Sequence, residues 1–419
     1  MSLHRPNLPF EILSNPEFLA AGTAISDLLQ PDRVLIGCSP THSGHAAASA
    51  LASVYSWVSP SRIITTNVYS SELAKLVANA LLAQRISSIN AVSAICERTG
   101  ADVSEVAACV GRDARIGSSF LRAGIGFGGS CFRKDVLSLV YLAESLGLPE
   151  VGTYWRQVVE MNEFQRERFA RNVIARLNNT LRGKKIVVLG YAFKKDTSDT
   201  RESPALGIIR TLLEEGPREI AVFDPACNPE VIRDEVAQLL GRDSIAANGG
   251  PLVVYGNAYE ACHNGDAVII ATEFDEFRTP TPTPEARISK PSALDIGQAG
   301  AQHNKIKGSD PRPFNDAFVS ETNLLVLHQS LSRDRRTSSY LTSDPLGRFH
   351  PEPQCEPGCP DCVGREPGRY RAGERLDWAK IAYHMREPKW VFDGRGVVDP
   401  DQLAKFGVRV ESVGRQSRW

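Results

Sequence analysis

One cysteine of this sequence lies in a setting that favours nucleophilic chemistry. Cys131 follows a glycine-rich run, residues 124–129, and precedes a stretch with helical apolar spacing, residues 136–146. Glycine permits backbone turns and close approach to a ligand. A helix N-terminus and the Lys134 ammonium both favour the thiolate, and Asp135 is placed to hold water or orient the sulfur. An inert buried thiol remains the better interpretation of the other eight cysteines.

The same glycines match the spacing G-x-G-x-x-G of dinucleotide-binding loops. That motif requires a buried strand before it and an acidic residue about 20 positions later. Residues 118–123, SSFLRA, lack the pattern of a buried strand. We therefore interpret the loop as the carrier of Cys131 rather than as a dinucleotide cradle.

Three more polar residues are candidates for chemistry. Lys75 and Asn79 lie four positions apart in a helix predicted over residues 71–98, so both can face one ligand. This helix is apolar nearly all round, which predicts burial, and a lysine in such a helix more often extends to solvent. Glu17 follows a strand predicted over residues 10–13. It is either a base at the ligand-binding edge of a sheet or a residue of a first helical turn.

The order of the predicted elements indicates an α/β chain. A strand–helix–strand series over residues 33–66 is typical of the last part of a doubly wound domain. Helices over residues 103–110 and 153–181 follow. The latter, about 28 residues and roughly 42 Å long, either joins two domains and offers a surface for self-association or is a long core helix.

A second Rossmann-like unit is predicted from residue 184 onward. Strands are expected over residues 184–190, 219–223, 266–271 and 390–392. The loop after the first of them carries Lys194, Lys195 and Arg201, side chains that suit a nucleotide diphosphate.

Residues 279–374 break this pattern, being rich in Pro, Gly, Ser and charge, and we interpret them as an irregular insertion. The spacing C-x3-C-x2-C indicates a possible zinc site, although most structural zinc sites pair two short knuckles. The candidate ligands are His350, Cys355, Cys359 and Cys362.

The totals narrow the class of protein. A chain of 419 residues has room for two or three domains. Its net charge of -1 gives no footprint for nucleic acid or acidic membranes, and it has no apolar run of transmembrane length. Nine cysteines without a framework favour reduced thiols. We therefore expect a cytoplasmic protein without nucleic-acid or membrane partners.

Five motifs together resemble the UDP-glucose and GDP-mannose dehydrogenase family, most closely its eukaryotic members that oxidise UDP-glucose. They lie at residues 15–24, 70–79, 126–135, 192–203 and 390–395. The resemblance implies four parts: a remnant of an NAD-binding domain (1–66), a central helical dimerisation and catalytic-cysteine domain (67–180), a UDP-sugar-binding domain (181–278 with 375–413) and the insertion (279–374).

This resemblance implies a four-electron oxidation of UDP-glucose to UDP-glucuronate, with NAD as the cofactor. Cys131 would be the nucleophile, passing through a thiohemiacetal and a thioester. Lys75 with Asn79 would stabilise the oxyanion, and Glu17 and Asp135 would hold and deprotonate the water.

Binding residues also follow from the resemblance. The sugar nucleotide would contact Glu17, Phe18, Leu19, Ala20, Ala21, Lys75, Asn79, Arg115, Arg122, Phe127, Gly128, Phe193, Lys194 and Arg395. NAD would contact Cys131, Phe132, Arg133, Lys134 and Arg201. Arg115 matches an arginine that reaches the sugar of a neighbouring subunit, which implies a homo-oligomer.

Three departures from the family pattern lead to two hypotheses. Ala21 stands where many members have a second glutamate, Arg122 replaces a common lysine, and the first strand and glycine fingerprint of the cofactor domain are absent. The chain is then either a UDP-glucose-oxidising enzyme known from a truncated sequence, or a sugar-nucleotide-binding or regulatory subunit that assembles with a full-length paralogue. Oxidation of GDP-mannose is a weaker third option, because no single residue reads the base.

Overall fold

The computed structural model describes residues 10–280 and 375–417. These residues belong to one compact unit, and a second unit, residues 282–369, lies outside them. The predicted insertion therefore lies outside the described residues apart from its first two positions. The same is true of the zinc candidates His350, Cys355, Cys359 and Cys362.

The larger sheet of the described residues contains six strands, all paired in parallel. They are β3 (Lys185–Leu189), β4 (Glu219–Phe223), β5 (Leu252–Val254), β6 (Ala267–Ile270), β7 (Trp390–Asp393) and β8 (Arg409–Ser412). The order across the sheet is β5-β4-β3-β6-β7-β8, so the direction of winding changes between β3 and β6. In open α/β sheets, ligands bind beyond the carboxyl ends of the strands at such a switch point.

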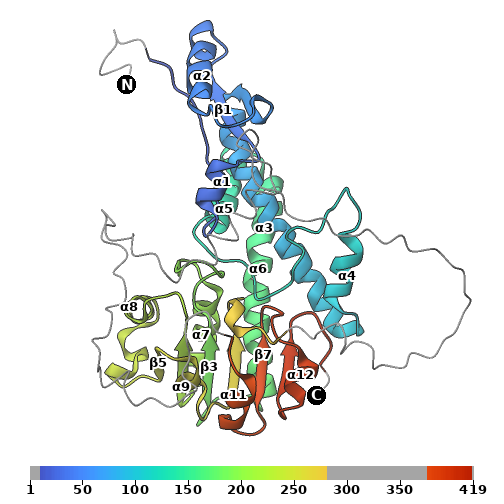
Figure 1. Cartoon of the computed structure of the whole chain (residues 1–419), viewed down its shortest axis with the longest axis vertical. Helices are drawn as coiled ribbons and strands as arrows, with labels where there is room; N and C mark the ends of the chain where they lie inside the picture. The colour runs from blue at the N-terminus through green and yellow to red at the C-terminus, as the bar shows by residue number, and fades with distance from the viewer. Residues whose placement is uncertain (1–9, 281–374, 418–419) are drawn as a thin grey trace, which may run out of the picture. The chain divides into compact units, whose positions relative to one another are not determined.

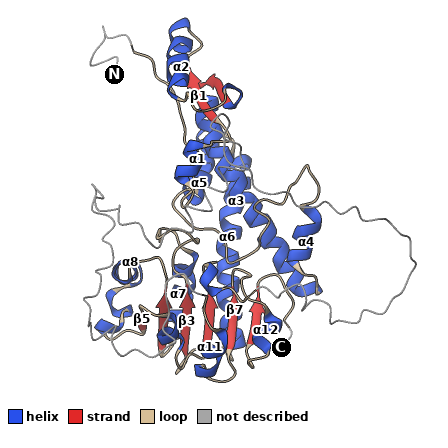
Figure 2. Cartoon of the chain, viewed as in Figure 1, coloured by secondary structure: helices blue, strands red, loops and turns tan. Residues whose placement is uncertain are grey.

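Burial explains why the central strands form where the sequence predicts them. The side chains of residues 186–189 in β3 and 267–270 in β6 are fully buried, as expected for a parallel sheet covered on both faces. Helices pack around this sheet (Figure 2). They are α7 (Pro204–Glu214), α8 (Pro229–Leu240), α9 (Ala258–Cys262), α11 (Trp378–His384) and α12 (Pro400–Ala404). The predicted Rossmann-like arrangement from residue 184 is confirmed.

A second, two-stranded parallel sheet is formed by β1 (Val34–Cys38) and β2 (Ile63–Asn67), with α2 (His42–Val54) between them in sequence. This confirms the predicted strand–helix–strand series. The strand predicted over residues 10–13 is wrong. Only Ser14 pairs there, exchanging hydrogen bonds of 2.9 and 2.7 Å with Gly37. Beyond Ser14 the ladder cannot continue toward Pro16, because Pro16 has no N–H to donate.

Three long helices connect the two sheets in sequence: α3 (Val68–Thr99), α5 (Phe132–Ser145) and α6 (Pro149–Arg176). They pack on one another, and α3 and α6 run side by side in Figure 1. The 28-residue helix α6 contributes residues 158 and 159 to this helical core and residues 169, 170, 173 and 174 to the core of the large sheet. It therefore joins two hydrophobic cores, and its role in self-association stays a prediction.

The two remaining α-helices of the described residues are short. α4 (Val103–Val110) matches its predicted range, and α1 (Ala24–Leu29) follows residues 15–23.

The prediction that α3 is buried all round is wrong: Leu73 is 42% exposed and Ile95 is 62% exposed. α3 packs against α5 and α6 through other faces. Across the described ranges, no helix combines the length and the apolar character needed to cross a bilayer.

Candidate active site

A cavity of about 1040 Å³ brings together most of the predicted site residues. One wall is a face of α3 that carries Lys75, Asn79 and Asn90. The loop before α5 forms a second wall, residues 15–21 a third, and loops that follow strands β3, β6 and β7 a fourth. The cavity thus lies at the switch point of the large sheet, where ligands are expected.

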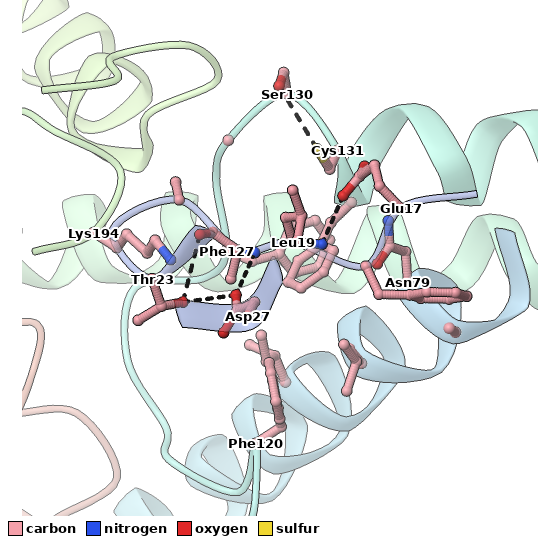
Figure 3. Close-up of a pocket in the computed structure, with 18 of the residues that line it drawn as sticks. Glu17, Leu19, Thr23, Asp27, Asn79, Phe120, Phe127, Ser130, Cys131 and Lys194 are labelled. Carbon is pink, nitrogen blue, oxygen red and sulfur yellow. Dashed lines mark hydrogen bonds between the residues drawn. The ribbon is translucent and has the colours of Figure 1, made fainter. Parts of the chain in front are cut away.

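Cys131 is an exposed free thiol on the wall of this cavity, and it is the N-cap residue of α5 (Figure 3). Its carbonyl accepts a hydrogen bond of 2.9 Å from the Asp135 N–H, which closes the first helical turn. Its sulfur lies 3.8 Å from the Ser130 hydroxyl. The predicted placement of this thiol at a helix N-terminus is confirmed.

Lys75 and Asn79 both face the cavity, and each contacts a carboxylate. Lys75 Nζ donates to the Glu17 carbonyl at 2.7 Å and to Glu17 Oε1 at 3.1 Å. Asn79 Nδ2 donates to Asp135 Oδ2 at 2.6 Å. Asp135 is only 4% exposed, and its other oxygen lies 3.5 Å from Lys134 Nζ. Glu17, Lys75 and Asn79 therefore share the cavity with Cys131, and Asp135 is linked to it through Asn79.

The hydrogen bonds of Glu17 affect the chemistry open to it. Partial burial would raise the pKa of Glu17, but bonds from the Leu19 N–H (2.6 Å) and from Lys75 outweigh it and hold this pKa below its ordinary value of 4.5. The carboxylate stays ionised at neutral pH. It is therefore better suited to orienting a water than to removing a proton from it.

Small residues in the glycine loop allow close packing against the sheet loops. A Cβ on Gly128 would lie 2.5 Å from the Glu202 carbonyl oxygen, and Gly129 has a φ of +83°. Its N–H donates to the Arg201 carbonyl at 3.0 Å. Residues 118–123 form no strand, which confirms that this loop is not a strand-borne dinucleotide cradle.

Arg395 connects three loops beneath the cavity. It follows β7, and its guanidinium donates to the carbonyls of Ala271 (2.8 Å), Gly126 (3.1 Å) and Phe193 (3.4 Å). Burial lowers its pKa from the ordinary value. Arg122 in turn donates to the Arg395 carbonyl at 2.7 Å. These two predicted site residues thus lie together in the structure.

The predicted cofactor residues lie around the N-terminus of α5. Phe132 packs edge-on against Phe127, with ring centroids 5.7 Å apart. Arg133 pairs with Glu163 at 3.1 Å, and Arg201 pairs with Asp199 at 2.7 Å. The hydrogen bonds that Arg201 donates to the Asp199 carboxylate raise the pKa of Arg201. Cys131, Phe132 and Arg201 line the cavity, whereas Arg133 and Lys134 do not.

Several predicted residues lie apart from the cavity wall or are already paired, among them the buried Asp135, which is bonded to Asn79. The side chain of Arg115 is 89% exposed, pairs with Asp113 and does not line the cavity. Lys195 pairs with Asp275 at 2.9 Å rather than standing free for a phosphate. The other predicted residues of the sugar-nucleotide set line the cavity; they are Phe18, Leu19, Ala20, Ala21, Phe127, Gly128, Phe193 and Lys194.

Sequence reasoning missed several residues of the cavity wall, including Asp27, Asn90, Asp199 and Glu273. A signal existed for Asn90, which follows Asn79 by 11 positions. Because that spacing is close to three helical turns, the two amides share a face of α3. Within the described residues, no group of three or more His, Cys, Asp or Glu side chains is arranged to hold a metal ion.

Three models of one protein family match the chain in order. They describe the UDP-glucose/GDP-mannose dehydrogenase family: its NAD binding domain over residues 2–58, its central domain over 69–164 and its UDP binding domain over 187–299.

Individual relatives support the same assignment. A UDP-glucose 6-dehydrogenase of Drosophila melanogaster is 52% identical over 274 residues, 65% of this chain and 57% of the relative. UDP-glucose 6-dehydrogenase 3 of Oryza sativa subsp. japonica is 53% identical over 416 residues, 97% of this chain and 66% of the relative. The solved UDP-glucose dehydrogenase of Pyrobaculum islandicum is 35% identical, with a TM-score of 0.55 over 64% of this chain and 56% of that structure. The chain thus spans little more than half the length of several relatives that it matches.

Proposed function

Because the chain belongs to the UDP-glucose/GDP-mannose dehydrogenase family, we propose that it takes part in the NAD-dependent oxidation of UDP-glucose to UDP-glucuronate. The observation that carries the proposal is the exposed Cys131 thiol at the N-terminus of α5, in one cavity with Lys75 and Asn79. Such a thiol can bond covalently to the carbon being oxidised. The names of the relatives favour UDP-glucose over GDP-mannose.

In this proposal the C6 alcohol of the glucose unit loses four electrons in two oxidations. The first gives an aldehyde, and the Cys131 thiolate adds to its carbonyl carbon to form a thiohemiacetal. The second gives a thioester, and water cleaves its C–S bond to release the carboxylate and restore the thiol. NAD, when bound, accepts one hydride in each oxidation. Covalent attachment to Cys131 keeps the aldehyde from escaping.

The remaining catalytic roles would fall to residues in the cavity and to Asp135 beside it. Lys75 Nζ and Asn79 Nδ2 are donors on one face of α3, suited to the oxygen that becomes negative when sulfur or water adds. In the structure Lys75 contacts Glu17 and Asn79 contacts Asp135. Glu17, ionised at neutral pH, would orient the water, and Asp135 would accept its proton. Since Ala21 supplies no second carboxylate, hydrolysis of the thioester would rest on these two residues.

The ligands would lie along the same cavity. The sugar nucleotide would extend toward Phe193, Lys194 and Arg395 at the carboxyl edge of the sheet. NAD would be held at the turn that begins with Cys131 and by Arg201, whose guanidinium suits a phosphate. Arg201 lies at the cavity wall, whereas Arg133 and Lys134 lie in this turn outside the wall, and these three positive charges suit an anionic dinucleotide.

The proposal is tested by NADH formation from UDP-glucose and NAD, with a Cys131→Ser control. We expect turnover that the serine variant loses. Oxidation that persists unchanged in the Ser variant would exclude Cys131 as the nucleophile.

A second function is favoured by the pairing of Lys75 with Glu17, which occupies the lysine side chain in the described structure. The chain would then be a sugar-nucleotide-binding or regulatory subunit that assembles with a full-length paralogue. Binding of UDP-glucose by calorimetry without NADH formation would support this function. An unchanged rate of the paralogue on addition of the chain would count against it.

A further inference from the structure

The loop that presents Cys131 is held largely by side chains of two helices. We propose that Asn162 of α6, assisted by Asn90 of α3 and Gln165 of α6, is a positioning residue for this loop. The consequence for ligand binding rests on the proposed function. The packing that carries the inference does not.

Asn162 bonds both polar groups of one loop residue. The Phe127 N–H donates to Asn162 Oδ1 at 2.8 Å, and Asn162 Nδ2 donates to the Phe127 carbonyl at 3.0 Å. Asn162 is only 6% exposed. A single buried amide thus satisfies both backbone polar groups of Phe127, as a neighbouring strand would in a sheet.

Two further amides hold the start of the loop in the same way. The Gly124 N–H donates to Asn90 Oδ1 at 2.9 Å, and Gln165 Nε2 donates to the Gly124 carbonyl at 2.7 Å. Gln165 Oε1 accepts from Arg168 at 2.8 Å, so this amide is itself fixed. Asn90 Nδ2 has no partner among the residues that the structure describes. We therefore assign the larger part in positioning the loop to Asn162 and Gln165.

The shape of the loop is matched to Asn162. Gly126 has a φ of +101°, and a Cβ at this position would lie 2.5 Å from Asn162 Oδ1. The amide therefore occupies space that another residue at position 126 would need. Neither Gly126 nor Asn162 can change without disturbing the other.

This anchor lies close to the nucleophile. Phe127 precedes Cys131 by four residues, and its ring packs against Phe132, the first residue of α5. Cys131 therefore lies on a segment fixed before it by Asn162 and after it by the contact of Phe132 with Phe127. A shift of Phe127 would move the thiol relative to Lys75 and Asn79.

Two variants separate positioning from general stability. Asn162→Leu keeps the branching at Cγ in a somewhat larger side chain but loses both bonds, whereas Asn162→Asp keeps an acceptor for the Phe127 N–H and loses the donor. Asn172→Leu, on the same helix but outside the cavity wall, is the matched control. In hydrogen exchange, we expect the Leu variant to speed exchange of residues 124–131 by about tenfold or more. The exchange rate of this loop in the Asp variant should lie between those of the wild type and the Leu variant. The exchange rate of peptides from α7 should not change in either variant.

The second measurement is the affinity for UDP-glucose, taken where circular dichroism shows each variant folded. We expect affinity to fall in the order wild type, Asp variant, Leu variant, with the Leu variant about tenfold weaker. A structural role alone would lower the melting temperature but leave the affinity of the folded protein unchanged, which would overturn the inference. Unchanged exchange of the loop would overturn it as well.

A failure of this inference can be distinguished from a failure of the proposed function. If the wild-type chain binds no UDP-glucose, the proposed function fails, and loop exchange together with the alkylation rate of Cys131 still decides whether Asn162 positions the thiol. If the Asn162 variants change both the loop exchange rate and the alkylation rate of Cys131, the inference is supported. If neither rate changes, the inference is wrong.

Discussion

Among the described residues, cysteines differ in exposure, and this difference decides which of them can react. Cys131 and Cys109 are exposed, whereas Cys38, Cys96, Cys227 and Cys262 are buried. Burial raises the pKa of Cys262 to about 12, and it also raises the pKa of Cys227. At pH 8 these two therefore remain protonated thiols in the folded protein.

Among the cysteines that the structure describes, we predict selective alkylation at Cys131 and Cys109 by iodoacetamide at pH 8, read by peptide mass spectrometry. We expect faster reaction at Cys131, which lies at the N-terminus of α5, than at Cys109, which lies in the last turn of α4. The buried cysteines should react only after urea unfolds the protein. Labelling of Cys262 at the rate of Cys131 in native buffer would contradict the placement of these thiols.

Gly126 provides a second test at the scale of single residues. An alanine there combines a left-handed φ of +101° with a Cβ 2.5 Å from Asn162 Oδ1. We predict that Gly126→Ala lowers the free energy of unfolding by about 3 kcal/mol, from backbone strain and displacement of a bonded amide. Urea denaturation measures this change.

The matched control is Gly117→Ala. Gly117 also has a positive φ, +68°, but a Cβ at this position would have no atom within 4 Å among the described residues. Gly117→Ala should lower the free energy of unfolding by about 1–2 kcal/mol, from the backbone conformation alone. Equal losses in the two variants would show that contact with Asn162 contributes nothing.

The sequence allowed much of the site to be predicted at this scale, because its chemistry is local. The cysteine after a glycine run and the Lys75–Asn79 spacing both depend on nearby residues, and the structure places them in one cavity. Asn162 was missed, because its partner Phe127 lies in another element. No local pattern shows which backbone group a buried amide will bond.

At the scale of elements, Arg395 joins the loops after β3 and β6 to the glycine loop. We predict that Arg395→Lys lowers UDP-glucose affinity at least about tenfold. A lysine keeps the charge but has one ammonium, which cannot reproduce the fork of a guanidinium that bonds several carbonyls. Calorimetry measures the affinity.

An exposed arginine gives the control for this change. Arg218 lies just before β4 on the surface, and Arg218→Lys should leave affinity and melting temperature unchanged. If Arg395→Lys behaved like this control, the three loops would not depend on Arg395 for their arrangement.

Prediction of the elements succeeded where burial follows a simple period. The central strands β3, β4 and β6 are continuous apolar runs, and they begin and end within about one residue of the predicted bounds. Short elements were missed: β5 has three residues, and α9 and α12 have five each. In elements of this length, contacts with the rest of the sheet outweigh local preference.

At the scale of the whole molecule, adjacency in the sheet was harder to predict than the strands themselves. β6 and β7 pair directly, from Ala267 with Trp390 to Ile270 with Asp393, although a long segment separates them in sequence. That pairing brings Arg395 to Phe193 and Gly126. The complete cavity therefore depends on contacts between distant segments, which the pattern of one segment does not contain.

Arg115 raises the question of assembly, because it does not line the cavity of its own chain. Its side chain is 89% exposed and pairs with Asp113. If, as the family resemblance implies, it completes the sugar site of a second copy, Arg115→Ala should weaken UDP-glucose binding without changing the melting temperature. Calorimetry and a thermal melt on one sample test both parts.

Mixing two inactive variants gives the sharper form of this prediction. Arg115→Ala keeps Cys131 but lacks the donated arginine, and Cys131→Ser keeps Arg115 but lacks the nucleophile. In a mixed dimer, the serine chain would supply Arg115 to the site that retains Cys131. NADH formation should then return to about a quarter of the wild-type rate, the statistical share for a two-fold dimer. Activity that stays at the level of the separate variants would mean that each site uses only residues of its own chain.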